Sequence, residues 1–241
     1  MTSLDPGTAV LELSSVSKQY GALRPLRIES LCIAAGSQLA LFGLDQPAAE
    51  VFINLVTGAS LPDSGVIRVF GRPTAEIVDS SDWLSTLDRF GIVSDRAALL
   101  DSLSVVQNLA VPFSLEIEPP SDEICQQATR LAREAALPEK TWDRPIAELD
   151  AAARVRVRLA RAVAFNPSIL LLEHPTATVS REEVAALARD IRALAERRGL
   201  ATVSLTMDQD FAAVVSTKTA TLEPATGRIK EGRLGKIGFW S

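Results

Sequence analysis

Residues 39–58 read LALFGLDQPAAEVFINLVTG, an apolar run that ends at a glycine and is followed by a helix-like pattern. This layout is typical of a phosphate-binding loop, G-x-x-x-x-G-K-[ST], in which backbone amides and a lysine hold phosphate groups. Gly43 stands at the first glycine of that pattern. Ala48, Ala49 and Glu50 stand where the second glycine, the lysine and the hydroxyl residue would be. The stretch therefore has the layout of a phosphate site without its binding groups.

The composition is that of a folded globular chain. The 241 residues are 47% hydrophobic and 23% charged, which predicts one large domain or a main domain with an insertion. The net charge of −5 argues against a grip on the nucleic-acid backbone, so no nucleic-acid partner is expected. The sequence has no run of 18 apolar residues and no signal-peptide pattern, which predicts a cytoplasmic chain without a membrane span. Cys32 and Cys125 are expected to be reduced, partly buried thiols.

Apolar patterning divides the chain into three parts. The first third favours strands separated by turns, with one helix over residues 48–56. The expected strands cover residues 9–20, 26–33, 38–43 and 66–73. The middle, roughly residues 101–163, favours helices, one of which begins near Ser121 with two acidic residues in its first turn.

The last third alternates between strands and a helix. Residues 169–172 form a continuous apolar run typical of a buried parallel strand. The helix that follows is expected to begin with a capping box made by Ser180 and Glu183, and to end at Gly199. The next strand is expected within residues 200–207. This order predicts an α/β fold with a mostly parallel core sheet, an antiparallel β layer and a helical insertion.

The order of these features resembles the ATP-binding cassette subunit of ABC transporters, which has a P-loop NTPase-like fold. The matching stretches are SKQYG (17–21), FGLDQPAAEVFINLVTG (42–58), PDSGVIRVFG (62–71), GIVSDRAALLDSLSVVQNLAVP (91–112), ELDAAARVRVRLARAVAFNPSILLLEHPTA (148–177), SLTMD (204–208) and TATLEPATGRIKEG (219–232). The resemblance implies a cassette domain over residues 9–233, with a helical subdomain at roughly 98–163 and a C-terminal tail at 234–241.

The resemblance also implies a role for each motif position. The nucleotide site would be formed by Tyr20 at the adenine-stacking position, Gly43, Ala48, Ala49, Glu50 and Val51 in the phosphate loop, Asp95 at the Q-loop glutamine, Glu173 at the Walker B aspartate, His174 at the catalytic glutamate and Met207 at the switch histidine. The signature motif, which would face a partner's nucleotide, would be Leu149, Asp150, Ala151, Ala152 and Ala153. Most of these positions carry a residue type that differs from the family pattern.

Electrostatics predicts poor binding of ATP in the usual pose. Asp45 and Glu50 would put carboxylates near the phosphates, and two like charges ~4 Å apart cost about 4 kcal/mol at an effective dielectric constant near 20. Pro47 lacks the backbone amide that a phosphate loop offers. Asp150 is expected to cap its own helix, which removes the positive helix end from a partner's phosphate. We therefore expect no cofactor, with ATP and Mg²⁺ as the alternative.

Two residues at the catalytic positions have competing interpretations. Glu173 either binds a cation together with Glu50 or, as we favour, is a carboxylate satisfied by local amides, because two carboxylates alone make a weak metal site. His174, the only histidine, is either a general base or, as we favour, a structural hydrogen-bonding residue at a strand end. No metal site is expected.

Other side chains also allow two interpretations. Arg154, Arg158 and Arg161 form either a solvated helix face or a stripe that docks acidic groups of a partner. Trp83 and Phe90 either pack in the core, which is favoured, or line a groove for a transporter's coupling helix.

The leading hypothesis is a pseudo-ATPase, a cassette subunit that acts as structural or regulatory partner of a membrane permease or of a second ABC cassette. Such a chain would be cytoplasmic and peripheral at the inner face of the membrane, and a homodimer is possible. One alternative is an active ABC ATPase of a variant subfamily in which Glu173, His174 and Asp95 take altered roles. Another is a soluble homodimeric interaction module unrelated to transport.

Overall fold

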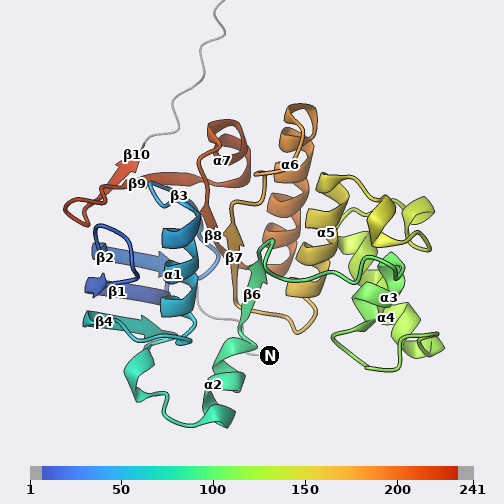
Figure 1. The fold of residues 1–241 in the computed structure, drawn as a ribbon, viewed down its shortest axis with the longest axis horizontal. Coiled ribbons are helices and arrows are strands. Elements are labelled where there is room, and N and C mark those ends of the chain that lie inside the picture. The colour runs from blue at the N-terminus through green and yellow to red at the C-terminus, as the bar shows by residue number, and fades with distance from the viewer. Residues whose placement is uncertain (1–6, 233–241) are drawn as a thin grey trace, which may run out of the picture.

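The computed structural model describes residues 7–232 of the chain. These residues form two sheets and a set of helices (Figure 1). The larger sheet has the strand order β10-β9-β3-β8-β7-β6 and the smaller one the order β2-β1-β4-β5. The strands are β1 (Ala9–Lys18), β2 (Leu26–Ala34), β3 (Gln38–Phe42), β4 (Ser64–Val69), β5 (Arg72–Pro73), β6 (Phe90–Val93), β7 (Ile169–Glu173), β8 (Ala201–Leu205), β9 (Lys218–Leu222) and β10 (Ile229–Gly232).

The larger sheet is parallel except at one edge. β3 pairs in parallel with β8 and β9, and β7 pairs in parallel with β6 and β8, whereas β9 and β10 form an antiparallel hairpin. Every residue of β7 and β8 is buried, as expected of strands covered on both faces. The smaller sheet is antiparallel throughout. The predicted α/β class, with a mostly parallel core sheet and an antiparallel layer, is confirmed.

The helices lie on both faces of the parallel sheet. They are α1 (Gln46–Val56), α2 (Ser80–Leu87), α3 (Val105–Ala110), α4 (Asp122–Glu134), α5 (Ala151–Ala162), α6 (Arg181–Arg198) and α7 (Gln209–Val215). One hydrophobic cluster joins α1 and the antiparallel sheet to one face of the parallel sheet. A second cluster packs the helices α3, α4, α5, α6 and α7 against the other face of the parallel sheet. In Figure 1 the antiparallel strands and the helices α3 and α4 lie at opposite ends of the molecule.

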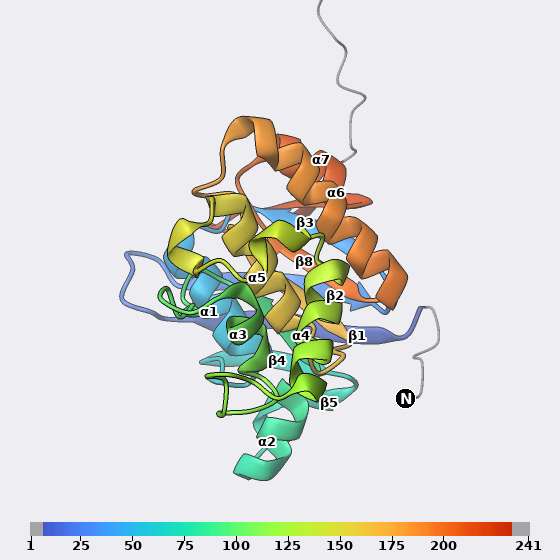
Figure 2. The same ribbon diagram turned by 90° about the vertical axis from the view of Figure 1, so that its right-hand side faces the viewer.

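The helical insertion does not have a hydrophobic core of its own. Buried residues of α3, α4 and α5 belong to the same cluster as those of β7 and α6. Figure 2 shows α3 and α4 in front of α5, on the side of the molecule away from the antiparallel strands. The boundaries 9–233 and 98–163 remain predictions, and the proposed tail at 234–241 lies outside the described residues.

Several local features differ from the sequence-based expectation. α1 begins at Gln46, two residues earlier than predicted, because Asp45 caps it and Pro47 fits a first helical turn. α2 and β6 were not predicted: α2 has only 8 residues, none of them fully buried, and β6 has only 4 residues. Cys32 is exposed, so the prediction of a partly buried thiol is wrong for this residue and right for Cys125.

Other expectations on helix ends and aromatic residues have mixed outcomes. The capping box at Ser180 is incomplete, because its hydroxyl donates to Glu183 Oε2 at 2.9 Å and accepts no backbone amide. Gly199 ends α6 in a left-handed conformation, as predicted. Phe90 is buried, whereas Trp83 is half-buried and its indole nitrogen donates to a backbone carbonyl. No helix within residues 7–232 is both long enough and apolar enough to cross a bilayer.

The tight approach of two strands at Gly43 gives a test of the fold. Gly43 has φ +92° and a Cβ there would lie 2.3 Å from the carbonyl oxygen of Leu222 in β9. Gly36 has a similarly positive φ, +71°, but a Cβ there would meet nothing within 4 Å. We expect Gly36→Ala to lower the free energy of unfolding by about 1 kcal/mol and Gly43→Ala by about 2 kcal/mol more, because only the latter adds a clash. Urea unfolding of both variants checks this, and equal losses would contradict the close approach.

Candidate functional site

The loop between β3 and α1 supplies its own anion to the helix. Asp45 is the N-cap of α1, and its Oδ1 accepts the amide of Ala48 at 3.0 Å. The Asp45 carbonyl accepts the amide of Ala49 at 2.8 Å, and Pro47 has no amide to offer. The helix N-terminus, which elsewhere attracts phosphate, is therefore already occupied by a carboxylate of the same chain.

The side chains expected to replace the phosphate-binding groups are mostly part of the core. Ala48 and Ala49 are buried in α1, and Val51 is partly buried against the same cluster. Glu50 is half-exposed and points to the loop after β6. Gly43 is required by its close contact with β9, so its presence is explained without a phosphate.

A buried carboxylate and one arginine form the centre of the site. Glu173, at the end of β7, has a side chain with 0% exposure. Arg96 Nη2 lies 2.9 Å from Glu173 Oε2, and Arg96 Nε lies 3.3 Å from the same oxygen. Gln46 Nε2 donates to Glu173 Oε1 at 2.7 Å. The remaining guanidinium nitrogen, Nη1, lies 3.1 Å from Glu50 Oε1. Both oxygens of Glu173 are thus bonded, and one guanidinium bridges two carboxylates.

This network corrects two sequence-based interpretations. The partners of Glu173 are the side chains of Arg96 and Gln46, so the prediction of local amides is wrong. The alternative in which Glu50 and Glu173 share a metal cation required them to lie close together. They do, but the cation between them is the guanidinium of Arg96. Within residues 7–232 no group of three or more His, Cys, Asp or Glu side chains is placed to hold a metal ion. Arg96 carries one positive charge and faces two carboxylates, so this group of three side chains keeps a net negative charge that adds to the charge of Asp45 near this loop.

Sequence reasoning missed Arg96 and assigned its neighbour instead. Asp95 faces α5, where its Oδ1 lies 2.8 Å from Arg158 Nη1, and so it is not part of the site. A signal was present, because the carboxyl ends of adjacent parallel strands meet at one edge of a sheet, and β6 lies beside β7. A cation soon after β6 is therefore close to Glu173 once that pairing is known.

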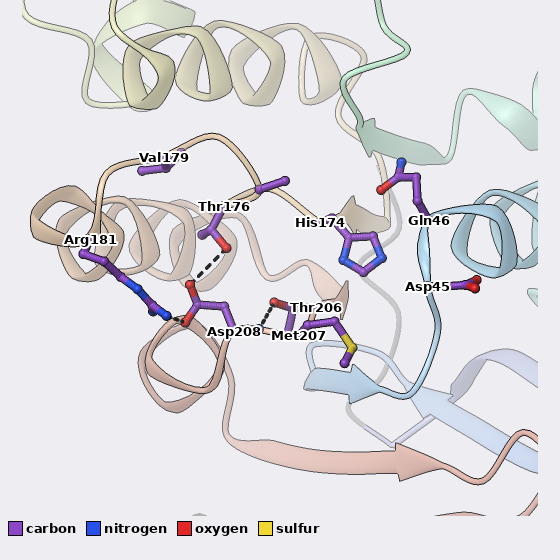
Figure 3. A pocket seen from close by; sticks show the side chains of 10 residues that line it. Asp45, Gln46, His174, Thr176, Val179, Arg181, Thr206, Met207 and Asp208 are labelled. Carbon is purple, nitrogen blue, oxygen red and sulfur yellow. Dashed lines mark hydrogen bonds and ion pairs between the residues drawn. The ribbon is translucent and has the colours of Figure 1, made fainter.

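His174 lies on the wall of a cavity of about 610 Å³ beside this network. Its backbone is strained, with φ +43°, and its amide donates to the Leu205 carbonyl at 2.9 Å. The imidazole Nε2 is buried and has no hydrogen-bond partner among the described residues. Figure 3 shows the ring between Gln46 and the exposed side chain of Met207. The hydrogen bond expected of the His174 side chain at this strand end is therefore made by the His174 backbone amide. The imidazole Nε2 has no partner among the described residues.

Tyr20 lies at the other side of the phosphate loop. It is half-buried and packs against the cluster formed by α1 and the antiparallel sheet. Burial is the larger cause that raises the pKa of the Tyr20 phenol, and the negative charge of Asp45 raises it further. Its contact with an adenine stays a prediction.

The signature positions adopt the conformation that Asp150 predicts. Asp150 is the N-cap of α5, and its Oδ1 accepts the amide of Ala153 at 2.7 Å. Leu149, Ala152 and Ala153 are buried, and Ala151 is half-buried. This segment therefore offers a methyl-lined helix start whose positive end is neutralised by its own acid.

The arginines of α5 do not form a solvated face. Arg158 pairs with Asp95, and its side chain is only 15% exposed. Arg161 Nη1 donates to the Ala98 carbonyl at 2.7 Å, and burial lowers the pKa of its guanidinium. Arg154 lies 3.9 Å from a carboxylate oxygen of Asp101. Arg158 and Arg161 therefore bind the segment after β6, whereas Arg154 donates to the carbonyls of Ala147 and Leu149. The interpretation of a solvated helix face is wrong for Arg158 and Arg161.

The arrangement of parallel sheet, β3–loop–α1 unit, antiparallel sheet and helical insertion defines a class of proteins, the ATP-binding cassettes. The cassette MJ0796, in a dimeric state bound to ADP and Pi, matches with a TM-score of 0.75 at 21% identity, over 92% of this chain and 99% of that chain. The cbiO1 structure from Clostridium perfringens, part of the ABC transporter complex cbiONQ, matches with a TM-score of 0.79 at 20% identity, over 94% and 89%.

A family model described as ABC transporter matches residues 26–177, and the chain belongs to this family. It is similar to the sulfate/thiosulfate import ATP-binding protein CysA of Caulobacter vibrioides, with 29% identity over 92% of this chain and 63% of the relative. It is also similar to the methionine import ATP-binding protein MetN of Brucella abortus, with 26% identity over 89% of this chain and 57% of the relative. The chain thus spans about three fifths of the length of these relatives.

Removal of Arg96 tests the central network. Arg96→Met leaves the fully buried Glu173 without its counter-charge, and we expect the free energy of unfolding to fall by about 3 kcal/mol, the lower end for a broken buried pair, because Arg96 is half-exposed. The double variant Arg96→Met/Glu173→Gln is expected to recover at least half of this loss.

The matched control is Arg72→Met, which removes an ion pair with Asp82 between two partly exposed side chains. It is expected to cost less than about 1 kcal/mol. Denaturant unfolding of all three variants measures the difference, and a loss for Arg96→Met no larger than that of the control would contradict the network.

Ionisation of Tyr20 tests the surroundings of the phosphate loop. It is the only tyrosine, so ultraviolet absorbance follows this phenol alone. We expect a pKa above the ordinary value near 10, because burial and Asp45 both disfavour the phenolate. The folded state then holds its proton longer than the unfolded state, so stability is lost as pH rises from about 10 through the folded pKa. Asp45→Asn should lower the pKa only partly, and a wild-type pKa of 10 or below would contradict the assignment.

Proposed function

We propose that this chain is a pseudo-ATPase of the ABC family, a cassette subunit that binds partner subunits and does not hydrolyse ATP. The observation that carries the proposal is the ion pair between the buried Glu173 and the half-exposed Arg96, in which the carboxylate has 0% exposure and both its oxygens are bonded. Mg²⁺ prefers carboxylate, phosphate and water oxygens. A magnesium ion supported by Glu173 would have to displace the guanidinium, and that would leave Arg96 without this partner.

The contacts of the phosphate loop support the same proposal. The amides of Ala48 and Ala49 already bond to Asp45, and Ala49 stands where the family pattern has a lysine. A triphosphate in this loop would meet the carboxylate of Asp45 and would lack the cation that balances its charge. We therefore expect no cofactor at this site. The altered phosphate-loop motif then acts as the cap of α1.

A groove beside α5 supports a role in an assembly. It has a volume of about 290 Å³. Its lining is mostly apolar with two guanidinium groups: Ile92, Ala97, Val111, Pro112, Arg158, Arg161, Ala162 and Phe165. Phe165 is 58% exposed and packs edge-to-face against Phe113, so the groove presents aromatic surface. We propose that this groove receives a segment of a membrane permease, consistent with relatives that are named as import ATP-binding proteins.

The proposed partners are that permease, a second ABC cassette, or both, and a homodimer is the alternative. No nucleic-acid partner is proposed. The proposed location is cytoplasmic, at the inner face of the membrane, where a partner would hold the chain. The substrates named for the relatives, sulfate or thiosulfate and methionine, belong to those proteins.

One observation favours a second candidate, an active ATPase of a variant subfamily. His174 stands at the catalytic-base position with a strained backbone and an unpaired, buried Nε2 on a cavity wall. A neutral imidazole there is able to accept a proton from water. This candidate requires phosphate release that is lost in His174→Ala.

Thermal unfolding and phosphate release test the proposal together. A nucleotide that binds the native state at 100 times its Kd adds about 2.7 kcal/mol of stability. We expect the melting temperature to be unchanged, within about 1 °C, by millimolar Mg-ATP, and phosphate release to equal the background without protein. Magnesium sulfate at the same ionic strength is the control for salt effects.

A rise of several degrees with Mg-ATP, absent in the control, would contradict the loss of binding. Phosphate release that His174→Ala abolishes would replace the proposal with the variant ATPase. Equal release by wild type and His174→Ala that persists through a second purification step would also contradict the proposal.

A further inference from the structure

The four residues 95–98, here called the clamp segment, link the two halves of the molecule. They follow β6 and precede α3, so they form the passage from the parallel sheet into the helical insertion. The segment starts with a tight turn, in which Ser94 Oγ accepts the amide of Arg96 at 3.1 Å and the Ser94 carbonyl accepts the amide of Ala97 at 3.1 Å. This turn directs neighbouring side chains of the segment to opposite sides.

One side of the clamp segment is bound to the core. Arg96 contacts Glu173 at the end of β7 and Glu50 in α1, at 2.9 Å and 3.1 Å. Gln46, also in α1, donates to the second oxygen of Glu173 at 2.7 Å. A single guanidinium thus joins the segment to a strand and a helix that lie on the core side.

The other side of the clamp segment is bound to α5. Asp95 lies 2.8 Å from Arg158 Nη1, and the carbonyl of Ala97 accepts Arg158 Nε at 3.2 Å. The carbonyl of Ala98 accepts Arg161 Nη1 at 2.7 Å. Each of the four residues therefore makes at least one ionic or charge-assisted hydrogen bond, the strong class of such bonds.

We propose that the clamp segment fixes the helical insertion in one orientation on the core without any ligand. The bonds described above join the segment to β7, α1 and α5, and the most deeply buried partner, Glu173, has 0% exposure. A rotation of the insertion against the core has to break either the Arg96–Glu173 pair or the Asp95–Arg158 pair. The first break leaves a buried charge unpaired, and the second leaves a largely buried guanidinium without its carboxylate. The inference does not depend on whether ATP is hydrolysed.

The two native cysteines suit a direct test. The chain has only Cys32 and Cys125; the first is exposed on β2, and the second is partly exposed on α4 in the insertion. Spin labels on both report the distance between the antiparallel sheet and the insertion by pulsed electron resonance. We expect wild type to give a single narrow distance distribution that millimolar Mg-ATP does not change.

Two variants open the clamp from opposite sides. Arg96→Met removes the bond to the core. Asp95→Asn removes the ion pair with α5 at its more exposed partner, and Arg158 keeps its hydrogen bond to the Ala97 carbonyl. Both are expected to add a second distance population and to raise amide hydrogen exchange in α3 and α4 at least tenfold. Arg72→Met, whose ion pair lies outside the clamp segment, is expected to keep the wild-type distribution.

The outcomes separate the clamp from the proposed loss of ATPase activity. Distributions of both variants that match wild type overturn the clamp and leave the ATPase proposal untouched. A broad or ATP-dependent distribution in wild type also overturns it. If Arg96→Met fails to fold, Asp95→Asn alone decides, because its exchange and distance data are compared with those of the folded control.

Discussion

The carboxylate of Glu173 lies at the end of a fully buried strand with no exposure to water, and such a group requires a counter-charge. Arg96 supplies it from the neighbouring strand end, and Gln46 completes the hydrogen bonding from α1. This ion pair joins the loop after β6 to β7, and the same loop contacts α5 through Asp95. It also uses the oxygens that a metal ion would need. One pair of charges therefore links the end of β7 to the passage into the helical insertion and occupies an oxygen of Glu173.

At the N-termini of two helices, a carboxylate of this chain occupies the place where a phosphate would bind in the family pattern. α1 begins with Asp45 and α5 begins with Asp150, and each carboxylate accepts an amide of its own first turn. A helix N-terminus attracts anions because its amides are unpaired and its dipole is positive there. At both places this chain supplies the anion itself. The two positions that the family pattern assigns to phosphate groups are thus stabilised as ordinary helix caps.

Much of the fold was predictable, because the buried strands are continuous apolar runs and their order along the chain leaves few topologies. The start of α1 was misplaced although Asp45 and Pro47 are good helix-start signals, since the expectation of a phosphate loop outweighed them. α2 gives only a weak apolar period, because it spans 8 residues with three apolar side chains. Arg96 could not be assigned from spacing, because its partner Glu173 lies 77 positions away and only strand pairing brings them together.

Gly43 matches the phosphate-loop pattern, but the packing of β9 against this position requires a glycine by itself. Its missing side chain leaves room for the carbonyl of Leu222, so the closing hairpin can lie against β3. At this position the spacing between β3 and β9 alone requires a glycine. The match of Gly43 to the phosphate-loop pattern is therefore no evidence that the loop binds ATP.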